Sequence, residues 1–162
     1  MKAVCVLANS KNDSITGTVT FKSINQVVEV QVEIECCDDN TMKPGQHGLH
    51  IHEYGDSRNG CTSSGGHYNP LNVDHGDQKC DIKNRHIGDL GNVKCVKDGV
   101  KTYIRQVMED SLIKLDGEHS IIGRTLVLHA DADDFGLGGF DDSKITGHAG
   151  SRIACGVIGL CN

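Results

Sequence analysis

Three of the nine histidines in this sequence fall within six residues: His47, His50 and His52. Side chains alternate along an extended strand, so His50 and His52 would lie on one face of it. Two imidazoles on one strand face provide half of a metal site. An isolated His-x-His pair is more often a solvated surface feature. The metal interpretation therefore depends on where the other histidines lie.

A second group of metal-ligating residues lies in a Gly- and Asn-rich stretch that predicts a loop. Further along, an apolar run over residues 121–128 ends in His129, which places one imidazole at the end of an expected strand. Imidazole and carboxylate donors without paired thiolates suit zinc, copper or iron rather than calcium or magnesium. The loop group consists of His67, His75, His86 and Asp89.

With these residues in this order, the sequence resembles the copper/zinc superoxide dismutases from Lys2 to Leu160. The segments that carry the resemblance are Gly-Leu-His-Ile-His-Glu (48–53), Gly-Asp (55–56), Gly-Cys-Thr-Ser (60–63), His-Tyr-Asn-Pro-Leu (67–71), Arg-His-Ile-Gly-Asp-Leu-Gly-Asn (85–92), Ile-Ile-Gly-Arg-Thr-Leu-Val-Leu-His (121–129) and Gly-Ser-Arg-Ile-Ala-Cys-Gly-Val-Ile-Gly (150–159).

The resemblance implies two metals as cofactors, one copper and one zinc per subunit. Because one histidine belongs to both ligand sets, its imidazole would use both ring nitrogens and lose the proton it normally keeps. The implied copper ligands are His50, His52, His67 and His129. The implied zinc ligands are His67, His75, His86 and Asp89.

The implied activity is dismutation of superoxide to dioxygen and hydrogen peroxide, with copper alternately reduced and oxidised. His67 would be catalytic as the proton carrier. Because the substrate is an anion and the formal net charge is −6, the site needs a local positive charge. Arg152 matches the arginine at the mouth of the copper channel, and is therefore the second catalytic residue expected. Lys144 would extend the steering field.

Other residues near these motifs receive supporting roles. The resemblance implies that Asp133 accepts hydrogen bonds from one histidine of each metal, His50 and His75. Asp141 and Asp142 would shape the steering field, although an ordinary solvated loop explains them equally well. We expect the remaining histidines to bind no metal: His47 as a framework residue beneath the site, His119 on a loop surface and His148 as a replacement for the Asn usual in the family.

Composition and pattern indicate an all-β chain. The 162 residues suit one domain over 1–162, and 20 glycines with no Trp predict many short strands around a Val, Ile and Leu core. Residues 15–21 and 27–34 alternate as half-buried strands do, and Lys97-Asp98-Gly99 predicts a hairpin turn. The pattern alone supports a sandwich or barrel. The resemblance adds an eight-stranded Greek-key β-barrel, an immunoglobulin-like sandwich with two long functional loops.

The eight cysteines divide into three groups. The resemblance implies a disulfide between Cys61 and Cys155. Cys5 and Cys95 lie in expected strands and are interpreted as small buried hydrophobes. The remainder are expected to be exposed thiols, although the vicinal pair among them offers an alternative as a soft-metal site. They are Cys36, Cys37, Cys80 and Cys161.

Two segments depart from the family pattern. Ten residues separate His75 from His86, two more than is usual, and Cys80 falls among them. Because the flanking ligands are retained, we expect the extra residues to extend into solvent. The segment over residues 35–46 is also longer than usual, and how it closes that end of the barrel is left open.

Assembly and location follow from the resemblance and from the amino end. A homodimer is expected through an apolar contact formed by Gly55, residues 122–124 and residues 157–160, and the family adds a copper chaperone as a partner class. No nucleic acid or membrane partner is expected. The amino end is too short and too weakly apolar for a secretion signal, which predicts a cytoplasmic location and makes the Asn12-Asp13-Ser14 sequon coincidental.

Two other classes of protein are alternatives to the enzyme. A copper-delivery protein with a dismutase-like domain would need a further metal-handling module, for which 162 residues leave no room. A metal-storing or structural relative without catalysis would be expected to have lost a copper ligand or the channel arginine. Since every such position is filled, the sequence favours the enzyme.

Overall fold

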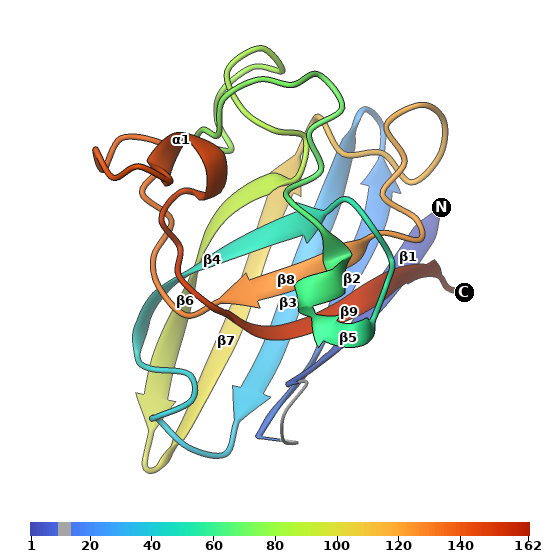
Figure 1. Cartoon of the computed structure of the whole chain (residues 1–162). Coiled ribbons are helices and arrows are strands. Elements are labelled where there is room, and N and C mark those ends of the chain that lie inside the picture. Colours follow the sequence, from blue (N-terminus) through green and yellow to red (C-terminus); the bar gives the residue numbers. More distant parts are fainter. Residues whose placement is uncertain (10–13) are drawn as a thin grey trace.

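The computed structural model describes residues 1–9 and 14–162, so Asn12 of the sequon lies outside the described residues. The regular structure of the described chain is almost entirely β-strand (Figure 1). They are β1 (Lys2–Ala8), β2 (Ile15–Ile24), β3 (Val27–Cys36), β4 (Gly45–His52), β5 (Arg58–Cys61), β6 (Asp89–Asp98), β7 (Lys101–Asp110), β8 (Thr125–His129) and β9 (Arg152–Leu160), with the short helices η1 (Thr62–Ser64) and α1 (Ser143–Thr146).

Eight of these strands form a closed antiparallel barrel in the order β1-β2-β3-β7-β6-β4-β8-β9. The chain crosses between sheet positions rather than always pairing with its next strand, since β3 pairs with β7 and β4 pairs with both β6 and β8. Pairing of β1 with β9 closes the barrel. This confirms the predicted eight-stranded β-barrel. Neither described helix is long and apolar enough to span a membrane.

The predicted strand pattern and hairpin are also confirmed. Along β3, side chains from Val28 to Ile34 alternate between the core and the surface, as a strand with one buried face requires. Asp98 pairs with Lys101 at the end of β6 and β7, and Gly99 between them has a φ of 63°, which a tight turn needs and glycine tolerates.

The long segment between β3 and β4 closes one end of the barrel through Met42. This side chain is fully buried in the core, and its backbone carbonyl accepts a hydrogen bond of 2.9 Å from Thr102 Oγ1. A buried carbonyl without a partner would be costly, so the Thr102 hydroxyl makes this placement stable. The segment over residues 35–46, whose conformation the sequence left open, thus closes this end of the barrel with the buried Met42 side chain.

The cysteine predictions are confirmed except at one position. Cys5 and Cys95 are buried, whereas Cys37, Cys80 and Cys161 are exposed. The prediction that Cys36 is an exposed thiol was wrong. β3 continues to residue 36, and because side chains alternate along a strand, Cys36 occupies the inward face and is 1% exposed. The two vicinal thiols therefore lie on different faces of the chain, and the soft-metal alternative loses its support.

Two long loops lie beside the ends of β4 and β8 (Figure 1). One runs over residues 62–88 and the other over residues 130–151, and His75 N donates to Lys144 O over 2.9 Å to join them. Within the first loop Cys80 is exposed, as expected for the extra residues. The insertion is nevertheless anchored, because Gln78 Nε2 donates to Glu109 O over 3.2 Å and Ile82 packs against the core.

Candidate metal centre

The end of β4 places two histidines toward the two long loops. β4 changes register against β6 between Gly48 and His50, and it pairs with β8 from Leu49 onward. Gly48 is needed at the change of register, because a Cβ there would lie 2.9 Å from Ala149 Cβ and 3.0 Å from His50 Cε1. The glycine therefore leaves room for the His50 ring and for the loop that covers it.

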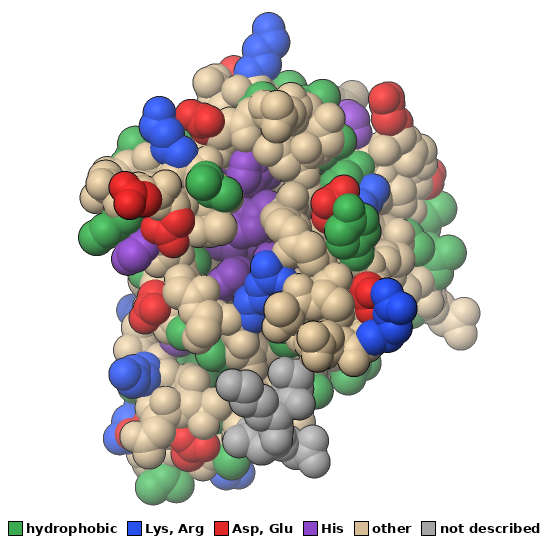
Figure 2. Space-filling view, in the orientation of Figure 1, with side chains coloured by type: hydrophobic (Ala, Val, Ile, Leu, Met, Phe, Trp, Pro, Cys, Tyr) green, Lys and Arg blue, Asp and Glu red, His purple; other side chains and the backbone are tan. Residues whose placement is uncertain are grey.

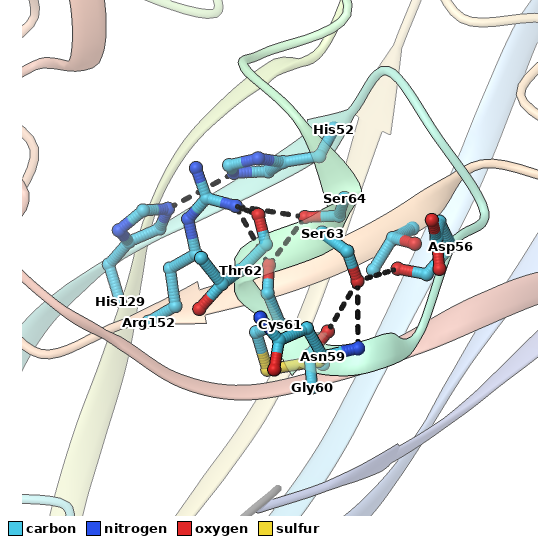
Figure 3. The surroundings of a disulfide bond; sticks show 12 residues. His52, Asp56, Asn59, Gly60, Cys61, Thr62, Ser63, Ser64, His129 and Arg152 are labelled. Carbon is cyan, nitrogen blue, oxygen red and sulfur yellow. Dashed lines mark hydrogen bonds between the residues drawn. A yellow bond between two sulfur atoms is a disulfide. The ribbon is translucent and has the colours of Figure 1, made fainter.

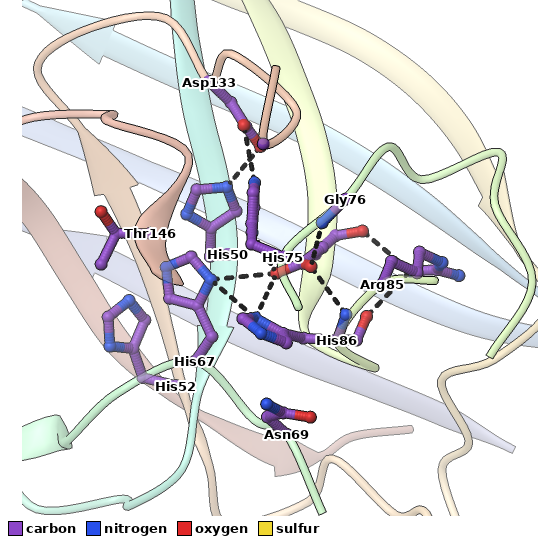
Figure 4. A network of polar contacts seen from close by, with 12 residues as sticks. His50, His52, His67, Asn69, His75, Gly76, Arg85, His86, Asp133 and Thr146 are labelled. Carbon is purple, nitrogen blue, oxygen red and sulfur yellow. Dashed lines mark hydrogen bonds and ion pairs between the residues drawn. The ribbon is translucent and has the colours of Figure 1, made fainter. Parts of the chain in front are cut away.

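The first long loop brings a third histidine beside them. His52 and His67 form an antiparallel bridge, and Tyr68 N donates to Ile51 O over 2.8 Å. This short pairing holds His67 next to the end of β4. His129, the last residue of β8, completes the group because its ring centroid lies 4.8 Å from that of His50. Figure 4 shows the rings of His50, His52 and His67, contributed by different segments, close to one another.

Four donor atoms of the predicted zinc set converge on one point. Asp89 Oδ1 lies 2.9 Å from His67 Nδ1, 3.0 Å from His75 Nδ1 and 3.1 Å from His86 Nδ1 (Figure 4). His67 Nδ1 and His86 Nδ1 are 3.4 Å apart. Zinc with ligands at about 2.0–2.1 Å in a tetrahedron requires donor separations of about 3.3 Å. The spacing therefore suits a tetrahedral ion, and all four residues are buried.

The outward atoms of this set are held by the protein. His75 Nε2 donates to Asp133 Oδ1 over 2.7 Å, and His86 Nε2 donates to Val73 O over 3.0 Å. Asp89 Oδ2 accepts from the backbone N–H groups of His86 and Gly76. Each of these contacts fixes a ring or carboxylate so that its other atom faces the common point.

The predicted copper set forms a second cluster on the other side of His67. Potential ligand atoms of His50, His67 and His129 all lie within 4.8 Å of one another. His52 joins them, since its Nε2 is 3.4 Å from His129 Nε2. His67 belongs to both clusters: its Nδ1 faces Asp89, and its buried Nε2 has no hydrogen-bond partner among the described residues.

The tautomers of the second cluster follow from its outward contacts. His52 Nδ1 lies 2.9 Å from Gly65 O and His129 Nδ1 lies 3.1 Å from Gly150 O. A carbonyl can only accept, so both nitrogens must donate, and in the neutral ring the opposite nitrogen carries a lone pair. His50 Nε2 likewise donates to Asp133 Oδ2 over 2.8 Å, and its buried Nδ1 has no partner within the described chain. Converging lone pairs of this kind need a cation.

Burial keeps these imidazoles neutral. It lowers the pKa of His129 to about 4 and that of His52 to about 2, and it holds the pKa values of His50 and His67 well below the ordinary range. Burial alone would raise the pKa of Asp89, but hydrogen bonds from three histidines lower it instead. Imidazole nitrogens and one ionised carboxylate are the donors that copper and zinc prefer, so the residues fit both ions.

The disulfide and Arg152 lie at the edge of the second cluster. The predicted Cys61–Cys155 bond is present, with the two Cα atoms 5.7 Å apart. Arg152 Nη1 donates to Cys61 O over 2.8 Å and to Ser64 Oγ over 3.0 Å (Figure 3). The half-buried guanidinium is thus oriented by the same loop that the disulfide ties to β9.

Lys144 is placed differently from Arg152. Its exposed Nζ lies 3.3 Å from Asp74 Oδ2, so part of its charge is offset by an acidic neighbour. On the same loop, Asp142 pairs with His148 at 2.6 Å, and the His148 ring stacks on Phe140. Figure 2 shows histidine side chains at the bottom of a hollow in the surface, with a Lys or Arg side chain beside them.

The other two histidines, His47 and His119, belong to neither cluster of potential ligands. His47 is buried, and its ring nitrogens contact the backbone carbonyls of His129 and Lys43 at 2.8 and 2.7 Å, as expected of a framework residue. His119, predicted on a loop surface, is instead half-buried.

Sequence reasoning gave no role to Arg85, although it lies next to a ligand histidine in the sequence. Its side chain is 1% exposed and forms a buried ion pair of 2.7 Å with Asp110. Nη1 also donates to Asp89 O over 2.8 Å, so the pair supports the backbone of a predicted ligand. A charged residue beside a ligand was the available signal, but its partner is 25 residues away.

Comparison with known proteins agrees with this geometry. The family described as "Copper/zinc superoxide dismutase (SODC)" matches residues 15–158. A curated relative from Candida albicans, "Superoxide dismutase [Cu-Zn]", is 48% identical over 162 residues, which covers 99% of this chain and 98% of the relative. The solved structure of "the clock protein EA4" superposes with a TM-score of 0.85 at 43% identity, covering 99% of this chain and 94% of that one. The chain belongs to the copper/zinc superoxide dismutase family.

Proposed function

We propose that this chain is a superoxide dismutase that holds copper on His50, His52, His67 and His129 and zinc on His67, His75, His86 and Asp89. The observation that carries the assignment is the position of His67 between two clusters of donor atoms. One ring nitrogen belongs to a set with the spacing of a tetrahedral zinc site, and the other is a buried lone pair facing the remaining histidines.

Copper, when bound, supplies the one-electron chemistry that interconverts superoxide, dioxygen and peroxide. The protein contributes a proton site at His67 Nε2. Since Nδ1 faces the Asp89 cluster, the ring can accept or release a proton only at Nε2, which points toward the copper ligands. The bridge to His52 and the buried surroundings keep the ring in place while that proton moves.

Arg152 supports the use of an anionic substrate. Its guanidinium is half-buried beside His52, and its hydrogen bonds to the 61–65 loop hold it there. A positive group at the edge of a hollow attracts superoxide even though the whole chain carries a formal charge of −6. We infer a smaller contribution from Lys144, because Asp74 lies close to its amine.

Metal analysis combined with an activity assay tests the proposal. We expect one copper and one zinc per chain in the purified protein and rapid dismutation, with both metals and activity lost after treatment with a strong chelator. A protein that held both metals but did not consume superoxide would favour the metal-storage alternative. Copper loading in cells with and without a copper chaperone would show whether such a partner is needed.

We also propose that the subunit forms a homodimer through the surface near β9. Val157 and Leu160 are exposed apolar residues there, and Tyr54 adds an exposed aromatic ring. Gly55 brings two of the predicted contact segments together within one chain, since a Cβ on it would lie 1.9 Å from Gly123 O. A two-fold contact would cover this apolar surface with its own copy. Light scattering of the metal-loaded protein at micromolar concentration should give twice the mass of one chain, whereas a monomer would refute the dimer.

A further inference from the structure

Asn92 joins two parts of the metal centre that are far apart in the sequence. It lies on β6, the strand that begins at Asp89, and its side chain faces the backbone of Asp133. Nδ2 donates to Asp133 O over 2.9 Å, and Oδ1 accepts from Asp133 N over 2.8 Å. One amide side chain therefore satisfies both backbone polar groups of Asp133, as a neighbouring strand would.

Asp133 is the carboxylate shared by the two clusters. Oδ2 accepts from His50 Nε2 over 2.8 Å and Oδ1 accepts from His75 Nε2 over 2.7 Å, and all three side chains are fully buried. Such an aspartate can orient both rings only if its own backbone is held in place. Backbone hydrogen bonds within the second long loop hold its neighbours, from Asp131 N to Ala149 O and from Asp134 N to Gly147 O. The N–H and C=O groups of Asp133 itself are instead paired with Asn92, which lies outside the loop.

The backbone of Asn92 is itself fixed to the barrel. Direct pairing of β6 with β7 extends only from Asp98 to Cys95. Beyond that point the side chain of Gln106 on β7 takes the place of the backbone pairing between β6 and β7. Its Nε2 donates to Asn92 O over 3.3 Å and its Oε1 accepts from Lys94 N over 3.1 Å. The anchor for Asp133 is therefore part of a rigid strand rather than another loop.

We propose that Asn92 is a positioning residue for both metals. By pairing with the backbone of Asp133 it sets the orientation of His50 in the copper set and of His75 in the zinc set. The inference rests on the two-metal function proposed above. Within the described residues the side-chain hydrogen bonds of Asn92 go to the backbone of Asp133 and to no ligand ring, so it acts through Asp133.

Asn69 provides a matched control because it makes the same kind of pair elsewhere in the site. Its Nδ2 donates to Val73 O over 2.9 Å and its Oδ1 accepts from Val73 N over 3.1 Å. Val73 O also accepts from His86 Nε2, which belongs to the zinc set alone (Figure 4 shows Asn69 below that set). Loss of Asn69 should therefore affect zinc only, while loss of Asn92 should affect both metals.

The experiment measures metal affinity rather than turnover. Wild type, Asn92→Ala, Asn92→Asp and Asn69→Ala are freed of metal with a chelator and titrated with zinc and copper against a competing chromophore. Copper paramagnetic resonance spectra are recorded on the loaded proteins. We expect Asn92→Ala to lower both affinities about tenfold, the low end of the range for residues that orient ligands. Its copper spectrum should shift, and Asn69→Ala should weaken zinc alone.

The isosteric Asn92→Asp variant separates positioning from packing and remains informative if the alanine variant does not fold. It fills the same space but places a carboxylate oxygen against Asp133 O, so a packing role would leave both affinities unchanged. We expect both to fall. Wild-type affinities in either Asn92 variant that folds, or a loss confined to zinc, would overturn the inference. A wild type that bound neither metal would instead refute the proposed function.

Discussion

Arg152 and His52 donate hydrogen bonds to the same carbonyl oxygen, that of Gly65. Arg152 Nη2 lies 2.7 Å from it and His52 Nδ1 lies 2.9 Å from it. The proposed steering cation and a proposed copper ligand are thus positioned by one backbone atom. This loop is itself attached to β9 by the disulfide at Cys61, so three features that are distant in sequence form one unit (Figure 3).

Charge reversal at Arg152 should slow the encounter with superoxide. Electrostatic guidance raises association rates by about 10- to 1,000-fold, so Arg152→Glu should lower the second-order rate of dismutation at least about tenfold and Arg152→Ala should lower it less. Stopped-flow or pulse-radiolysis rates over a salt series would measure this. Salt should slow the wild type, because the Debye length is about 10 Å at 0.1 M, and should have a flat or reversed effect on the Glu variant.

The matched comparison is Lys144→Glu, which makes the same charge change beside Asp74. It should have the smaller effect. If Arg152→Glu kept both the wild-type rate and its salt dependence, the guiding charge would have to lie elsewhere.

The two ligand sets should separate on mutation. Asp89→Asn removes a carboxylate whose Oδ1 lies 2.9–3.1 Å from a ring nitrogen of each of three histidines, so it should release zinc and loosen the 62–88 loop while some copper-dependent turnover remains. His129→Ala should instead abolish turnover and retain zinc, because His129 belongs to the second cluster alone. Metal content and dismutation rate are measured on the same samples. Near wild-type turnover of the His129 variant would show that the copper assignment is wrong.

Removing the disulfide should lower both stability and rate. Cys61 and Cys155 are 94 positions apart, and in the chain-entropy model closing a loop of this length contributes roughly 4–5 kcal/mol. Cys155→Ser should therefore lower the free energy of unfolding by an amount of that order, measured in denaturant. The rate should also fall, because the loop that orients Arg152 loses its tie to β9.

Cys161→Ser is the control for this change, since Cys161 is an exposed free thiol. It should leave stability and rate at wild-type values. Equal losses in the two serine variants would mean that the effect arises from the substitution rather than from the disulfide.

After removal of the metals, the protein should lose stability in mild acid. Burial lowers the pKa of His129 to about 4 and that of His52 to about 2, whereas unfolding returns each to about 6.5. The unfolded chain therefore binds more protons below about pH 6.5, and the free energy of unfolding should fall from there toward pH 4, where His129 in the folded state also becomes protonated.

His75 contributes with the opposite sign at higher pH. Burial alone would lower its pKa, but hydrogen bonds to Asp133 and Asp89 raise it to about 9. This stabilisation is complete below about pH 6.5 and is lost as the pH rises toward 9. Denaturant titrations of the metal-free protein should therefore show maximal stability near neutral pH. A stability that stayed constant from pH 7 to pH 4 would contradict the assignment of buried neutral histidines.

Local sequence determined the types of ligand, the strands and the class of fold. His50, His52 and His129 could be placed at strand ends because hydrophobic alternation over a few residues reports which face of a strand is buried. The ordered motifs then identified the family and the Cys61–Cys155 pair. These features depend on residue type and on spacing along the chain, both of which are read directly from a sequence.

The tertiary structure decided which distant groups meet. Cys36 is buried because β3 extends to it, and Met42 fills the end of the barrel because Thr102 on another strand satisfies its carbonyl. Asn92 meets Asp133 although 41 positions separate them. Such contacts depend on the register between strands and on how the loops cross them. A polar side chain's partner is set by that geometry, and hydrophobic periodicity carries no information about it.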